Sequence, residues 1–315
     1  MTTIGVLLPL PPGGPPLSPG DSPLGQAAAQ LSREGVRVVF GSKLENGSIF
    51  GFQARELSWV PVQTRIKGLY DNWPSYIQQD AWRRMLAQAG EKTHIANPVA
   101  FTESCGDRLA MQRMLEMCGV QMTPIEAKAK GFRRALAGWG TAFLKPRNRG
   151  SFTRVRHISS EEELPTPDQT EPMVLQKSHG APSGWGGMVV RALCQREITG
   201  DWVFPTPVAF RSMADHVAGG AKDAVVDPAE RALPAQAMKQ IAKLSQETVD
   251  ALCDDHLCVE IGIDFAVDRF FNPWPIDIEA KPKWGLLALA RKQPDRWDDE
   301  VVAAYARPLR YLAQQ

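Results

Sequence analysis

The nine residues FLKPRNRGS, from Phe143 to Ser151, place a lysine at the point where an apolar run ends. A proline follows Lys145 at once, and two arginines and a Gly-Ser pair complete the turn. Lysine and arginine beside a glycine-bearing loop suit phosphate oxygens, because such a loop also offers backbone N–H groups. The stretch therefore fits a phosphate-binding loop, and it also fits a solvated basic loop after an ordinary strand.

Several other charged residues lie inside apolar runs, where an unpaired charge is costly to bury. Arg191 lies in MVVRALCQ, where it needs either a functional partner or a buried salt bridge. Asp264 lies in GIDFAV and needs a metal ion or a cation, and Glu279 is in a similar position. Asp277 alternates with Glu279, so both side chains face the same side of a strand. Each of these residues is therefore a candidate for a functional role, with a structural salt bridge as the alternative.

The overall composition narrows the class of protein. The chain has 315 residues, 43% of them hydrophobic, with a formal net charge of +1. This length allows two or three domains, and the small charge gives no field that favours nucleic acid or an anionic membrane. The five cysteines form no C-x-x-C pair, which argues against a disulfide framework or zinc knuckle and suits a reducing cytoplasm. We interpret MTTIGVLLPLPP as a first strand rather than a signal peptide, and no apolar run approaches the roughly 20 residues that span a bilayer.

The first third of the chain reads as a parallel α/β layer. An apolar strand is expected at 4–8, a helix at 24–34 and a second strand at 36–40, and the Pro/Gly-rich loop 9–23 is either functional or mobile. GLYDNWPS predicts a strand and a turn, and 75–89 predicts a helix with Ser75 as its cap. ESCGDRLAMQRMLEMCGV predicts one amphipathic helix. Its expected apolar face consists of Leu109, Met114, Leu115 and Met117.

The rest of the chain reads mainly as strands. A hairpin is expected from 139–145 and 154–158, and a second one from the strands on either side of FFNPWP within 259–282. Further strands are expected at 173–178, 188–195 and 202–212, with helices at 233–253 and 295–315.

The order of these pieces along the chain resembles the ATP-grasp superfamily. The matching stretches are GLYDNWPS, GDRLAMQRMLEMCGVQMTP, FLKPRNRGS, VLQKS, VVRALCQ, FRSMADHVAGG and GIDFAVDRFFNPWPIDIEAKP. They cover most of the chain, and the sequence is most similar to the spore-coat-associated YheC/YheD-like branch, with features of the RimK-like ligases. The resemblance implies an α/β and α+β architecture, with nucleotide clasped between two α+β subdomains. It places a Rossmann-like domain at 1–104, a lid subdomain at 105–176 and a C-terminal subdomain with the metal site at 177–315.

The resemblance also implies roles for individual residues. ATP and Mg²⁺ are the implied cofactors, and Lys145 corresponds to the family's phosphate-binding lysine. Arg108 stands where the family has a second lysine, Gly150 and Ser151 correspond to the flap over the phosphates, and Gln176, Lys177 and Ser178 correspond to the strand that meets adenine, largely through backbone. Arg191 resembles the arginine near the terminal phosphate, and Asp264 and Glu279 resemble the metal ligands, for which Asp277 could stand in. Arg211 could bind a substrate carboxylate or an acidic neighbour.

Two positions depart from the family pattern. Val189 stands where the family has an Asp, and Lys281 stands where it has an Asn. Because a protonated lysine cannot bind Mg²⁺, either Lys281 replaces a later lysine of the family or one metal ligand is missing.

The resemblance implies an enzyme, a cytoplasmic ATP-dependent ligase that joins a carboxylate to an amine or another nucleophile through an acylphosphate. An amino acid or peptide is the expected substrate, by analogy with the superfamily alone. The alternative is a degenerate member that binds nucleotide, or acts as a structural or assembly partner, without turnover. We expect small-molecule partners, with neither nucleic acid nor membrane, and an apolar face that could mediate a homodimer.

Overall fold

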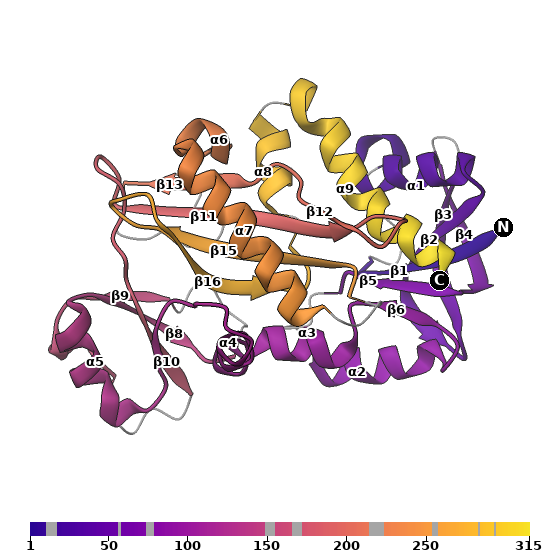
Figure 1. Ribbon diagram of the computed structural model, residues 1–315. Helices are drawn as coiled ribbons and strands as arrows, with labels where there is room; N and C mark the ends of the chain where they lie inside the picture. Colours follow the sequence, from indigo (N-terminus) through magenta and orange to yellow (C-terminus); the bar gives the residue numbers. More distant parts are fainter. Residues whose placement is uncertain are drawn as a thin grey trace.

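The computed structural model describes residues 1–10, 18–55, 58–73, 79–148, 155–165, 172–213, 224–253, 258–282, 284–292 and 294–315. Within these residues the strands form three sheets, which follow one another along the chain. Figure 1 shows the third sheet between the other two. The expected Gly150 and Ser151 lie outside the described residues, as does Ser75, the expected helix cap.

The first sheet has a parallel centre, as the sequence predicts. Its strand order is β4-β3-β2-β1-β5-β6, in which β1 pairs in parallel with β2 and β5, and β5 pairs in parallel with β6. The strands are β1 (Thr2–Leu7), β2 (Val36–Glu45), β3 (Ser48–Arg55), β4 (Ser58–Arg65), β5 (Gly68–Asp71) and β6 (His94–Ala96). Two helices belong to this part, α1 (Pro23–Arg33) and α2 (Gln79–Leu86). The expected strands at 4–8 and 36–40 and the helix at 24–34 are confirmed.

An antiparallel extension of this sheet is absent from our expectations. Strand β3 pairs antiparallel with β2 on one side and with β4 on the other. The β2–β3 turn is Asn46-Gly47, and both residues have positive φ, 49° and 74°. Asn-Gly favours this conformation, and such a turn matches the twist of a hairpin.

The second sheet carries Lys145. Its order is β7-β10-β8-β9, with β8 antiparallel to both β9 and β10, so the expected hairpin is confirmed. The elements are β7 (Ile125–Glu126), α5 (Phe132–Trp139), β8 (Ala142–Pro146), β9 (Arg156–Ile158) and β10 (Met173–Lys177). Helix α5 packs Phe132 and Leu136 against Leu144 and Leu175, which leaves Lys145 on the other face of the sheet.

The third sheet carries Arg191 and the expected carboxylates. Its order is β14-β13-β11-β15-β16, with β12 paired to β11, and the expected β15–β16 hairpin is confirmed. The strands are β11 (Gly187–Arg196), β12 (Trp202–Val203), β13 (Val208–Ser212), β14 (Val225–Pro228), β15 (Glu260–Val267) and β16 (Pro273–Glu279). The helices after β13 are α6 (Ala229–Ala232), α7 (Ala235–Leu252), α8 (Trp284–Lys292) and α9 (Pro294–Gln314).

The helix expected from ESCGDRLAMQRMLEMCGV is two helices in the structure. Helix α3 (Val99–Gly106) ends before Asp107, and α4 (Arg108–Met117) begins after it. The Asp107 carboxylate accepts hydrogen bonds from the N–H groups of Leu109 and Ala110, so it caps α4. The expected apolar face is confirmed at Leu115, which is fully buried. It is wrong at Met117, which is 88% exposed. Met117 lies at the end of α4, where the core no longer covers the helix.

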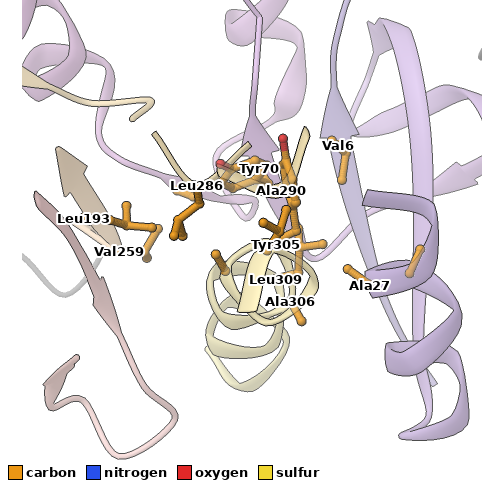
Figure 2. Close-up of a cluster of buried hydrophobic side chains, with 14 of the residues drawn as sticks. Val6, Ala27, Tyr70, Leu193, Val259, Leu286, Ala290, Tyr305, Ala306 and Leu309 are labelled. Atoms are coloured by element: carbon orange, nitrogen blue, oxygen red, sulfur yellow. The ribbon is translucent and has the colours of Figure 1, made fainter. Parts of the chain in front are cut away.

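Helix α9 returns the end of the chain to the first sheet. Figure 2 shows Tyr305, Ala306 and Leu309 of α9 between Val6 and Ala27 on one side and Leu193 and Val259 on the other. The same apolar cluster contains Leu286 and Ala290 of α8. One core therefore joins the first and third sheets, and burying such side chains contributes about 1.5–3 kcal/mol each. Within the described residues, no helix combines the length and apolarity needed to cross a membrane.

A buried polar joint accompanies this core. Tyr70 O–H and Gln195 Nε2 donate to the carboxyl group of Glu260, at 2.5 and 2.9 Å. Asn97, whose φ is 58°, donates to the carbonyls of Glu260 and Ala280 and accepts from Val259 N–H. Burial raises the pKa of Glu260 to about 8, although the Gln195 hydrogen bond and the charge of Lys281 lower it. The joint fixes the start of β15 against β5 and β6.

The stability of the protein should therefore fall as Glu260 ionises. A carboxyl group whose pKa is raised on folding stabilises the fold below its unfolded pKa, and this contribution is lost as the pH rises through the folded value, here about 8. Relative to Glu260→Gln, the wild type should lose on the order of a few kcal/mol of unfolding free energy between pH 5 and pH 8.5. Urea unfolding of both proteins at the two pH values measures this. Parallel pH profiles would show that Glu260 does not titrate in this range.

Candidate functional site

One face of the third sheet gathers a cation and three carboxylates. Arg191 donates from Nε and Nη2 to the two Asp264 oxygens, both at 2.7 Å, and from Nη2 to Glu279 Oε1 at 3.0 Å. The side chains of all three residues are 10–14% exposed. The paired donors match the planar fork of arginine to a carboxylate, which is the strongest geometry for such a pair.

Strand register places these side chains together. Arg191 on β11 lies opposite Asp264 on β15, and Asp264 lies opposite Asp277 on β16. Glu279 is paired with Gly262, two residues from Asp264, so alternation puts it on the same face. The expectation that Asp277 and Glu279 share a face agrees with this register.

The electrostatics favour a charged arginine. Burial works against its charge, but Asp264, Glu279 and Asp277 together raise the pKa of Arg191 above its ordinary value. Because each charge is held by an opposite one, the cluster tolerates its burial.

A β-bulge beside the cluster connects it to the second sheet. The β15–β16 pairing passes from Asp277 directly to Pro275, so Ile276 has no partner on β15. The Ile276 carbonyl instead accepts from Gln176 Nε2 at 3.0 Å, and Gln176 Oε1 accepts from Lys145 Nζ at 2.6 Å. Lys145 is 8% exposed and Gln176 1% exposed, so the amide bridges the two sheets in a buried position. Bulges are common beside functional sites, where they change the direction of the chain.

Arg108 makes a second connection between the sheets. Its Nη1 donates to the Pro146 carbonyl at 2.6 Å, and its Nη2 lies 3.5 Å from Asp277 Oδ2. The first residue of α4 thus contacts the end of β8 and the carboxylate of β16. The structure therefore brings Arg108, Lys145 and Gln176 to the carboxylate cluster.

The base of the FLKPRNRGS turn is fixed by an ion pair that sequence reasoning missed. Arg147 Nε lies 3.0 Å from both Asp107 oxygens, and Arg147 Nη2 lies 2.6 Å from Oδ2. Despite partial burial, Arg147 and the capping N–H groups hold the pKa of Asp107 below its usual value. The Arg147 carbonyl also accepts from Arg108 N–H at 3.1 Å. The position of Asp107 before a helix was the available signal, since Asp is a preferred N-cap.

Three other expected site residues make their described contacts outside the carboxylate cluster. The N–H groups of Lys177 and Ser178 donate to the carbonyls of Pro124 and Thr141, at 3.0 and 3.1 Å. Arg211 lies opposite Met188 on β11, so alternation puts it on the other face of the sheet from Arg191. Arg211 pairs there with Asp227 and lies over the Trp185 ring, which is the acidic-neighbour alternative.

Lys281 is paired at the end of β5. Its Nζ donates to Asp71 Oδ2 at 2.9 Å and to the Trp73 carbonyl, and it lies 5.3 Å from the centre of the Trp82 ring. Burial lowers the pKa of Lys281, and Asp71 partly offsets this effect. Lys281 therefore joins the end of β16 to β5, and its charge is paired with Asp71.

The donors of the cluster suit a hard cation. Carboxylate oxygens are the ligands that Mg²⁺ takes, and one or two suffice where phosphate oxygens and water complete its shell. Among the described residues, no group of three or more His, Cys, Asp and Glu side chains is arranged to hold a metal by itself. A metal here would therefore share the cluster with another source of oxygen ligands.

Removing Arg191 should destabilise the fold strongly at neutral pH. Arg191→Met leaves Asp264 and Glu279 buried without the cation they share, which costs about 3–5 kcal/mol for a buried pair. Urea unfolding at pH 7 measures this loss.

Arg310→Met is the matched control, because Arg310 also holds a carboxylate, Glu34, with two donors. That pair is more exposed, so its loss should cost no more than about 1 kcal/mol. Equal losses in the two variants would contradict the importance of the buried cluster.

Comparisons with known proteins bear on the fold. No protein-family model and no curated protein matches the sequence. Among solved structures, the VanG D-Ala:D-Ser ligase of Enterococcus faecalis matches with a TM-score of 0.62 and 10% identity, over 99% of this chain and 98% of that one. A RimK domain ATP-grasp protein of Sphaerobacter thermophilus matches with a TM-score of 0.58 and 12% identity, over 99% of both chains.

A third match is the carboxyaminoimidazole ribonucleotide synthase of Aspergillus clavatus in complex with ATP. Its TM-score is 0.56 with 11% identity, over 89% of this chain and 70% of that one. Likeness at such low identity concerns the arrangement of elements, and it extends over nearly the full chain. The chain has the ATP-grasp fold.

Proposed function

We propose that the protein is an ATP-dependent ligase that joins a carboxylate to an amine or another nucleophile through an acylphosphate. The observation that carries this proposal is the chain of contacts from Lys145 and Arg108 on one side to Asp277, Asp264 and Glu279 on the other. Cations and carboxylates that meet between two sheets are the parts that a magnesium nucleotide requires.

In the proposed function, the cations at the second sheet bind the phosphates of ATP. Lys145 and Arg108 bind phosphate oxygens, and Gly150 and Ser151 supply backbone N–H groups. Lys145 now donates to Gln176, and Arg108 to the Pro146 carbonyl. Phosphate oxygens are stronger acceptors than these neutral groups, because hydrogen bonds to ionised acceptors are roughly twice as strong. Gln176, Lys177 and Ser178 line the adenine side of this proposed site.

Asp264 and Glu279 would hold Mg²⁺, and Asp277 could stand in as a ligand. The ion would neutralise charge on the phosphates and orient them. Arg191, which pairs with both carboxylates in the structure, would stabilise charge on the transferred phosphoryl group, where such stabilisation is most effective.

The reaction proposed has two steps. An oxygen of the substrate carboxylate attacks the γ-phosphorus of ATP, so that an acylphosphate forms and ADP leaves. The nucleophile then attacks the acyl carbon, the C–O bond to phosphate breaks, and an attacking amine gives up a proton. Arg191 would stabilise the charge in both steps. The function named for VanG, a D-Ala:D-Ser ligase, and the ATP complex of the Aspergillus enzyme agree with this class of reaction.

The second candidate is a nucleotide-binding or assembly protein without turnover. The observation that favours it is Val189, which lies on the same face of β11 as Arg191 and brings no carboxylate to the site. The position of Lys281 weakens this candidate, because the lysine pairs with Asp71 instead of disturbing the cluster.

We further propose that the protein belongs to the YheC/YheD-like branch and acts in the cytoplasm as a homodimer. Its substrates would be small-molecule carboxylates and amines, an amino acid or peptide among them.

ATP should raise the melting temperature of the wild type in a Mg²⁺-dependent way. A ligand at about a hundred times its Kd adds roughly 2.7 kcal/mol, which is several degrees in a chain of this size. Lys145→Ala should lose the shift, whereas the exposed Lys243→Ala should keep it. Differential scanning fluorimetry with and without Mg²⁺ measures this, and ADP release is then assayed with carboxylates and amines. No shift at millimolar ATP would overturn the ligase and favour an assembly protein, and a shift without ADP release would favour a nucleotide-binding protein without turnover.

The Asp107–Arg147 pair should position Arg108 for nucleotide. Asp107→Asn keeps the cap of α4, since Asn caps as well as Asp, but it removes the ionised partner of Arg147. We expect about tenfold weaker ATP binding, measured by titration calorimetry, with a nearly unchanged melting temperature. Unchanged ATP affinity would contradict the positioning role. Tighter binding would show instead that Arg147, once released, contacts phosphate itself.

A further inference from the structure

A small cavity adjoins the cluster on the side of α8. It has a volume of about 10 Å³, is partly open, and lies between the third sheet and the first turn of α8. Its walls include Arg191, Thr206, Val208, Pro282, Gly285 and Leu286. Space of this size accommodates about one group as large as a water molecule.

Among the described residues that line the cavity, all but Arg191 and Thr206 are apolar. The Arg191 guanidinium is turned to Asp264 and Glu279, so the cavity meets its aliphatic part near Cδ. The backbone N–H of Thr206 donates a hydrogen bond to Glu300 Oε1 at 2.8 Å. A water molecule needs two to four polar partners in such a place, and these walls suit an apolar group better.

Gly285 keeps the cavity open. A Cβ added at Gly285 would lie 3.4 Å from Val208 and 3.6 Å from Arg191 Cδ, which are ordinary contacts. Alanine therefore fits without a clash, and it would take up space that the glycine leaves. The backbone at position 285 does not require glycine, and the lack of a side chain there leaves the space of the cavity free.

From these observations we propose that the cavity receives the α-substituent of the carboxylate substrate, and that it selects a substituent no larger than a methyl group. The inference rests on the proposed function, in which the acyl group reacts beside Arg191. An acid whose carboxylate lies at Arg191 places its α-carbon next to this apolar wall. The substrate class is therefore small carboxylic acids with a hydrogen or a methyl group on the α-carbon, the methyl-bearing ones being preferred.

The test compares acids that differ by one methyl group, acetate with propionate and glycine with alanine. Their affinities are measured by titration calorimetry on the full chain with Mg²⁺ and a non-hydrolysable ATP analogue, and without nucleotide. The wild type should prefer the methyl-bearing acid of at least one pair by about tenfold, the lower end of what one methyl is worth in an apolar pocket. Gly285→Ala should lose this preference, because its own methyl group fills the space.

Gly138→Ala is the matched control. Gly138 also lies in a helix, α5, and a Cβ there would meet no atom within 4 Å. Both variants gain helix propensity, so neither is expected to unfold, but Gly138→Ala should keep the methyl preference.

The possible outcomes separate the two proposals. A methyl preference that survives in Gly285→Ala, or a wild type that binds neither pair or prefers the smaller acids, overturns the cavity assignment. ADP release in that case leaves the ligase proposal standing. A methyl preference that is lost in Gly285→Ala supports the cavity as a site for a small acid, and the absence of ADP release from any acid and amine would then overturn the reaction proposed for that acid.

Discussion

The ion pairs between Arg191 and the carboxylates of Asp264 and Glu279 are the constraint on which the rest of the site depends. Charges at this depth are tolerated because each has an opposite partner within about 3 Å. Three carboxylates converge on one face, and without a cation among them they would repel each other. The strand register that places them there is in turn fixed by the apolar side chains on the opposite face.

This arrangement makes the two sheets depend on each other. The bulge at Ile276 provides a carbonyl for Gln176, and Gln176 holds Lys145, so the position of the lysine depends on the irregularity in β16. Arg108 contacts β8 and Asp277 together. Lys145 donates to a neutral amide oxygen and Arg108 to a neutral carbonyl, and anionic phosphate oxygens are stronger acceptors than either of these groups. In the proposed function the nucleotide replaces the contacts that now join the sheets.

The sequence predicted the parts of the site that follow from the cost of burying charge. Arg191 and Asp264 lie in apolar strands, so each had to find a partner, and they find each other. The contacts of Lys281 and Arg211 could not be predicted in this way, because they depend on tertiary neighbours, Asp71 and Asp227, and on strand pairing. The break at Asp107 was missed because the apolar spacing continues through it. The β2–β3 hairpin was missed although Asn46-Gly47 was a readable signal. The predicted subdomain boundaries stay a prediction, and α9 packs on the first sheet as well as beside the third.

The central claim is that the carboxylates facing Arg191 and the cations of the second sheet together hold a magnesium nucleotide. The most direct measurement is the equilibrium affinity for ATP, with and without Mg²⁺, of the wild type and of the double variant Asp264→Asn, Glu279→Gln. The account predicts that Mg²⁺ tightens ATP binding by the wild type at least about tenfold, or roughly 1.4 kcal/mol, and has little effect on the variant. The same dependence on Mg²⁺ in both proteins would contradict it.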